Sequence, residues 1–136
     1  MGIKYNLQTM QYRTTFENLT SARVKDCFLM NKLIIVVDEG ELGRAVGKNG
    51  GNIKKIEAIL KKKIRVIEYS NDILKFVKNL IYPITAKSIV QENNNITIFV
   101  DGVQDKGRII GRDRKNINEL KHIISRYFKI GDIKIA

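Results

Sequence analysis

The chain has 136 residues, 43% hydrophobic and 29% charged, which is typical of a globular protein. Its net charge of +11 comes from both halves, with 13 basic against 7 acidic residues in 1–70 and 12 against 7 in 71–136, and favours a polyanionic partner. Because it has one cysteine, one histidine, no long apolar run and no secretory signal, we expect a cytoplasmic protein without disulfide, metal, cofactor or membrane span.

Hydrophobic periodicity in the first half predicts the order helix–strand–strand–helix–helix–strand. Residues 1–6 are expected to form a short extension. The continuous apolar run at 33–37 is typical of a strand that is buried on both faces. The predicted elements are a helix at 7–19, strands at 22–30 and 33–37, helices at 41–46 and 51–62, and a strand at 64–69.

The second half of the chain repeats this order. Ser70 or Asn71 is expected to cap its first helix, and Pro83 to end it. The polar run at 92–95 is typical of a turn. The predicted elements are a helix at 71–80, strands at 86–91 and 96–100, helices at 104–110 and 114–128, and a strand at 133–135. We therefore expect two small domains, 1–70 and 71–136, that pack against each other without a flexible linker.

The loop Gly47-Lys48-Asn49-Gly50 lies between two predicted helices of the first half. Glycine allows close approach of a backbone or a phosphate, and the first N–H groups of a helix carry partial positive charge. Such a loop favours an anion, and Lys48 adds a mobile charge. Lys54 and Lys55 lie on the solvent face of the following helix. A Gly-x-x-Gly loop before a helix is also common as a simple turn.

A second copy of this segment makes a simple turn a poor explanation. At an offset of 64 residues, identical or similar residues recur on both sides of the loop. An internal repeat of this length indicates one supersecondary unit that is used twice. The matched pairs are Gly43 with Gly107, Arg44 with Arg108, Gly47 with Gly111, Asn52 with Asn116, Ile53 with Ile117, Ile56 with Leu120, and Leu60 with Ile124.

The α-β-β-α-α-β unit with its glycine loop resembles the type II KH domain, a single-strand RNA-binding module. Two such units without a linker resemble the KH pair of NusA-like transcription factors, above all the short archaeal members. The fold class implied is α+β, with two tandem type II KH domains. The matching motifs are Val24-Lys25-Asp26-Cys27, Val37-Asp38-Glu39-Gly40, the run 43–50, Val66-Ile67-Glu68-Tyr69-Ser70, and Gly111-Arg112.

The resemblance implies that each loop clamps the backbone of single-stranded RNA while bases lie in an apolar groove beside it. The second loop is degenerate, because Arg114 replaces the closing glycine and Asp113 adds a negative charge. Either the neighbouring cations compensate, or Asp113 caps the following helix. The candidate RNA-binding residues are Arg44, Gly47, Lys48, Asn49, Gly50, Lys54, Lys55, Arg108, Gly111, Arg112, Asp113, Arg114 and Lys115.

The function implied is that of an RNA-binding factor in transcription termination or elongation. A KH protein of ribosome assembly or RNA decay is the alternative, and a module that docks on RNA polymerase or another protein is a third hypothesis. An enzyme is disfavoured because Leu42 and Asn49 stand where a Walker A loop needs glycine and Ser or Thr. Aromatic residues make up 7% of the chain, so we expect backbone clamping with modest sequence preference.

Overall fold

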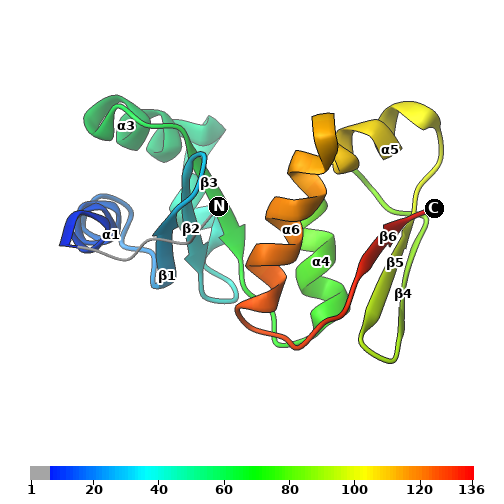
Figure 1. Ribbon diagram of the computed structural model, residues 1–136. Helices are drawn as coiled ribbons and strands as arrows, with labels where there is room; N and C mark the ends of the chain where they lie inside the picture. Colours follow the sequence, from blue (N-terminus) through cyan, green and yellow to red (C-terminus); the bar gives the residue numbers. More distant parts are fainter. Residues whose placement is uncertain (1–6) are drawn as a thin grey trace. The chain divides into compact units, whose positions relative to one another are not determined.

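The computed structural model describes residues 7–136 and divides the chain into two compact units, the first ending at Ser70 and the second running from Asn71 to Ala136 (Figure 1). Each unit contains a three-stranded sheet and follows the predicted order α-β-β-α-α-β, with a short 3₁₀ turn before its third helix. The predicted α+β class is confirmed. The short extension predicted for residues 1–6 lies outside the described residues.

The first unit closely follows the predicted elements. Its sheet has the order β1-β2-β3, with β1 and β2 antiparallel and β2 and β3 parallel. All five residues of β2 are fully buried, which confirms the strand buried on both faces that its apolar run predicts. The elements are α1 (Leu7–Thr20), β1 (Val24–Leu29), β2 (Leu33–Val37), α2 (Leu42–Val46), η1 (Lys48–Gly50), α3 (Gly51–Leu60) and β3 (Ile64–Glu68).

One hydrophobic core holds the helices of the first unit to its sheet. Phe16 of α1, Ala45 of α2 and Ile56 of α3 are fully buried in a cluster with strand residues such as Leu33 and Ile35. Figure 1 shows α1 and α3 on the same side of this sheet. The core therefore fixes where α2 ends and α3 begins, and with them the loop between these helices.

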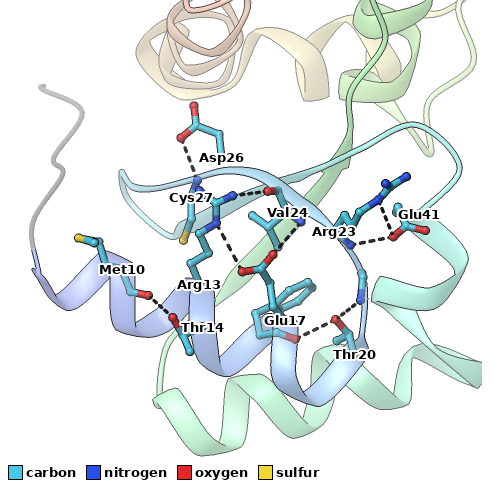
Figure 2. A network of polar contacts seen from close by, with 12 residues as sticks. Met10, Arg13, Thr14, Glu17, Thr20, Arg23, Val24, Asp26, Cys27 and Glu41 are labelled. Carbon is cyan, nitrogen blue, oxygen red and sulfur yellow. Dashed lines mark hydrogen bonds and ion pairs between the residues drawn. The ribbon is translucent and has the colours of Figure 1, made fainter.

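Polar contacts join α1 to the start of β1 (Figure 2). The Arg13 guanidinium donates to the Val24 carbonyl at 2.5 Å, and the Val24 N–H donates to Glu17 Oε2 at 3.4 Å. The Arg23 N–H donates to Glu41 Oε1 at 2.8 Å. Because Glu41 is the N-cap residue of α2, this last bond ties the start of β1 to the helix that leads into the glycine loop.

The second unit repeats this topology. Its sheet has the order β4-β5-β6, with β4 and β5 antiparallel and β5 and β6 parallel, and helices α4, α5 and α6 lie on one side of it (Figure 1). The elements are α4 (Ile73–Ile81), β4 (Ser88–Glu92), β5 (Asn95–Phe99), α5 (Val103–Ile110), η2 (Arg112–Arg114), α6 (Lys115–Ser125) and β6 (Ile133–Ile135).

The capping residue predicted for α4 is wrong. Asp72, not Ser70 or Asn71, occupies the N-cap position in an extended conformation, and its carboxylate accepts from the Leu74 N–H at 3.1 Å. Asp72 sits two residues before the amide that needs an acceptor, which is the spacing of an N-cap bond. No helix within the described residues combines the length and apolar character needed to cross a membrane.

Two helices end earlier than their sequences predict. α3 stops at Leu60 because Lys61 adopts a left-handed conformation, with φ 54° and ψ 41°. α6 stops at Ser125 because the chain tightens there: Arg126 N–H donates to the Ile123 carbonyl and Tyr127 N–H to the Ile124 carbonyl. This turn brings Tyr127 against Phe76 of α4, with ring centroids 5.6 Å apart.

We predict that the Cys27 thiol is unreactive in the folded protein. Its side chain is buried, and burial raises the pKa of the thiol to about 12, so the nucleophilic thiolate is scarce at pH 8. Iodoacetamide should modify the protein in denaturant but not in native buffer. Modification at the rate of a free thiol in native buffer would contradict the prediction.

The same burial predicts a loss of stability at high pH. The unfolded thiol ionises near pH 9 and the folded thiol near pH 12, so the free energy of unfolding should fall as pH rises from 9 to 12. Cys27→Ala provides the baseline.

Candidate nucleic-acid interface

The two glycine loops open with the same backbone conformation. Gly47 has φ 74° and ψ 173°, and Gly111 has φ 76° and ψ 169°. This region of backbone space is essentially restricted to glycine. In both loops the N–H of this glycine donates back to a glycine four residues earlier, at 2.9 Å to Gly43 and 2.8 Å to Gly107. The first glycine of each loop therefore ends one helix and redirects the chain toward the next.

The third and fourth residues of each loop are left-handed, although the two loops differ in sequence at these positions. Asn49 and Asp113 have φ values of 57° and 54°, and Gly50 and Arg114 have φ values of 71° and 61°. The second loop has Arg114 where the first has its closing glycine, Gly50. Its backbone nevertheless follows the same path, with Arg114 in a conformation that costs a non-glycine residue free energy.

The amino ends of α3 and α6 are not capped by the side chains of their N-cap residues, Gly50 and Arg114. The alternative role of Asp113 as the helix cap is thus wrong, since Arg114 holds that position. A helix start without a side-chain cap offers N–H donors and partial positive charge to an anion. The N-cap and first helical amides already donate to loop carbonyls: those of Gly50 and Gly51 to Gly47 and Lys48, and those of Arg114 and Lys115 to Gly111 and Arg112. Each loop therefore combines the positive end of a helix dipole with basic side chains.

The predicted basic residues surround these helix starts. Every charged side chain among the candidates is exposed, and the loop residue Asn49 is exposed as well. Each unit gathers its own candidates around one loop and the first turns of one helix. The exposed residues are Arg44, Lys48, Asn49, Lys54 and Lys55 in the first unit, and Arg108, Arg112, Asp113, Arg114 and Lys115 in the second.

Arg44 and Arg108 each have an acidic neighbour three residues earlier in the chain, a pairing that the prediction omitted although its spacing is visible in the sequence. Arg44 Nη1 lies 4.0 Å from Glu41 Oε2, and Arg108 Nη1 lies 3.7 Å from Asp105 Oδ1. Both pairs have the same three-residue spacing and both arginine side chains are more than half exposed. Because both guanidinium groups are exposed to solvent, the pairs orient them without preventing contact with phosphate, although Glu41 itself is buried.

An asparagine spans each loop, a role that sequence reasoning missed. Asn52 Nδ2 donates to the Arg44 carbonyl at 2.9 Å, and Asn116 Nδ2 donates to the Arg108 carbonyl at 2.8 Å. The signal in the sequence was the recurrence of asparagine five residues after the first glycine of each loop. In both units the bond links the helix before the loop to the helix after it.

No residue of either loop lines the cavity of about 500 Å³ in the second unit, which lies between α4 and β4. That cavity is therefore not the apolar groove expected beside the loop. Within residues 7–136, no group of three or more His, Cys, Asp or Glu side chains is placed to hold a metal ion.

Comparisons with known proteins show which family this chain is similar to. Residues 11–87, which include the first glycine loop, match the KH-domain family. The chain is 35% identical to the probable transcription termination protein NusA of Methanococcus vannielii, over all of this chain and 81% of that one. It is 30% identical to the protein of the same name from Halobacterium salinarum, over the full length of both. The protein in the crystal structure of APE1850 has a TM-score of 0.76 and 32% identity, covering 97% of this chain and all of that chain.

We predict that Arg114→Gly stabilises the protein. Glycine removes the left-handed strain at this position and loses some conformational entropy, so the free energy of unfolding should rise by about 0.5–1 kcal/mol in urea denaturation. Arg114→Ala is the matched control, because it removes the same charge and keeps the strain. Equal stability of the two variants would show that the backbone at residue 114 is unstrained.

Proposed function

We propose that this chain, which belongs to the archaeal NusA-like family of KH-domain proteins, is a single-stranded RNA-binding factor of transcription termination. In this proposal it holds nascent RNA by its backbone at two glycine loops. The observation that carries this proposal is the repeated loop: in both units a left-handed turn leads into a helix start without a side-chain cap, among exposed cations.

Phosphate groups are the natural ligands of such a loop. The first amides of α3 and α6, those of Gly51 and Lys115, donate to the carbonyls of Lys48 and Arg112. The helix starts therefore offer a phosphate their partial positive charge and the next amides of the first turn. Lys48 in the first loop and Arg112 in the second follow the first glycine directly and are exposed, so each can reach a phosphate beside those amides. These contacts recognise the backbone and carry little base information.

The charge of the whole chain supports the same function. A net charge of +11, distributed over both units, attracts a polyanion before any specific contact forms. Because there is no tryptophan and few other aromatic residues, base stacking contributes less than in many single-strand binders. Binding should therefore be strongly dependent on salt and tolerant of sequence, as suits a factor that meets many transcripts.

We predict that the double variant Lys48→Ala, Arg112→Ala binds single-stranded RNA more weakly than the natural protein. The slope of log affinity against log salt concentration should fall by roughly 0.7 for each phosphate contact that is lost. A fluorescence anisotropy titration with a short unstructured oligouridylate, repeated at several salt concentrations, measures both quantities.

The control for this experiment is the double variant Lys63→Ala, Lys129→Ala. It removes the same number of charges from exposed positions just beyond the carboxyl ends of α3 and α6, away from the loops. General electrostatic attraction would make the two double variants equivalent. In that case the loops would not be the binding site, and the proposal would be rejected.

The role in transcription is tested separately, by crosslinking the protein to RNA in cells and sequencing the bound fragments. Enrichment of nascent transcripts, especially near their 3′ ends, is the expected result. Enrichment of ribosomal RNA precursors would instead support ribosome assembly.

A contact with RNA polymerase is tested by whether polymerase copurifies with the protein. Treatment with RNase before purification distinguishes polymerase that binds the protein directly from polymerase that is held through the transcript.

A further inference from the structure

The asparagines that span the loops make the same contact in two different sequence settings. The Asn52 and Asn116 side chains reach back from the first turn of α3 and α6 to the last turn of the preceding helix, where they donate to the carbonyls of Arg44 and Arg108. The intervening loops share only their first glycine. The contact is thus a constant feature of the unit, whereas the loop residues vary.

The first glycine of each loop provides the space for this side chain. A Cβ atom on Gly47 would lie 2.8 Å from Asn52 Cγ, and one on Gly111 would lie 2.7 Å from Asn116 Cγ. Both distances are far shorter than ordinary van der Waals contact. Nothing lies within 4 Å of a Cβ added to the second glycine, Gly50, so that position is constrained only by its positive φ.

We propose that Asn52 and Asn116 are positioning residues for RNA binding, and that the first glycine of each loop is needed to admit the asparagine side chain as well as to turn the chain. The proposal rests on the function proposed above. Neither asparagine is required to touch RNA. Each holds the loop in its observed conformation, with the helix start and the basic side chains together, so the protein does not have to order the loop when RNA binds.

The second loop depends most on this restraint. Asp113 and Arg114 are both left-handed without being glycine, so the loop has lower-energy conformations available if its ends are released. The Asn116 bond fixes the two helix ends relative to each other across the loop. A strained loop keeps its conformation only where the surrounding structure holds it in place, and the Asn116 bond is one of the contacts that do so.

The test compares Asn116→Ala with Asn118→Ala. Both replace an asparagine on α6 that is exposed, and they lie two residues apart, but only Asn116 spans the loop. Asn116→Ala should weaken binding to the oligouridylate by roughly three- to fivefold, as expected for one side-chain hydrogen bond. Asn118→Ala should bind like the natural protein. Asn52→Ala tests the first loop in the same titration.

The salt dependence separates a loop that is less ordered before binding from a complex that has lost contacts between cations and phosphates. A loop that must be ordered on binding lowers the apparent affinity by the fraction of competent protein, but leaves the phosphate contacts of the complex unchanged. The slope should therefore be preserved in Asn116→Ala, while amide hydrogen exchange of the loop becomes faster. A reduced slope would mean that contacts between cations and phosphates are lost from the complex itself, which would overturn the assignment.

A second set of variants tests the role of the glycine. If Gly47 admits the Asn52 side chain, then Gly47→Ala should weaken binding, and adding Asn52→Ala should cause little further loss. If each substitution weakens binding by its own factor, and the double variant shows the product of the two factors, this role of Gly47 is refuted.

The outcomes for the loop cations keep the two proposals apart. If the asparagine variants bind like Asn118→Ala while Lys48→Ala, Arg112→Ala binds weakly, the positioning role fails and the proposed function stands. If the cation variant also binds normally, the proposed function fails.

Discussion

Each unit of this chain depends on one backbone constraint. The chain must pass from one helix to the next through a turn with left-handed residues, and the second helix then starts without a side-chain cap. Gly47 and Gly111 meet the first part of this constraint in a conformation reserved for glycine. The positions of the candidate RNA-binding residues in the loops and on α3 and α6 follow from it, because the turn sets where these two helices begin. The hydrophobic core contributes by fixing the helices on either side.

Much of the fold could be predicted because the sequence contains it twice. The continuous apolar run of β2 and the offset between the two loops gave the order of elements, and β2 and β6 have the predicted bounds. Helix ends were harder. Three consecutive polar residues precede α4, and hydrophobic periodicity does not tell which of them adopts the extended conformation of an N-cap residue. In the structure it is Asp72. Lys61 ends α3 although lysine favours helices, so its left-handed conformation had no local signal.

The candidate site was predictable in composition but not in geometry. Glycines and lysines near a helix start identify the loop, since their chemistry is local. The acidic partners of Arg44 and Arg108 lie three residues earlier in the chain, a spacing that is visible in the sequence. The bonds of Asn52 and Asn116 depend instead on how two helices meet, which no short motif specifies. The repeat did mark the asparagines as matched, but a match alone does not reveal a hydrogen bond across eight residues.

The second loop shows why a sequence motif and a binding geometry are different things. Losing the closing glycine suggests a lost site, because Arg114 carries a Cβ where the pattern has none. The structure shows nothing close to the Cβ position of the equivalent Gly50, so the extra side chain meets no obstacle and only the positive φ has a cost. In return the second loop presents Arg112, Arg114 and Lys115 around Asp113, whereas the first presents Lys48. The first loop has one left-handed residue that is not glycine, Asn49, and the second has two, Asp113 and Arg114. The second loop thus retains the shape of the first at a higher conformational cost, and in the proposed function its additional cations would attract a polyanion over a longer range.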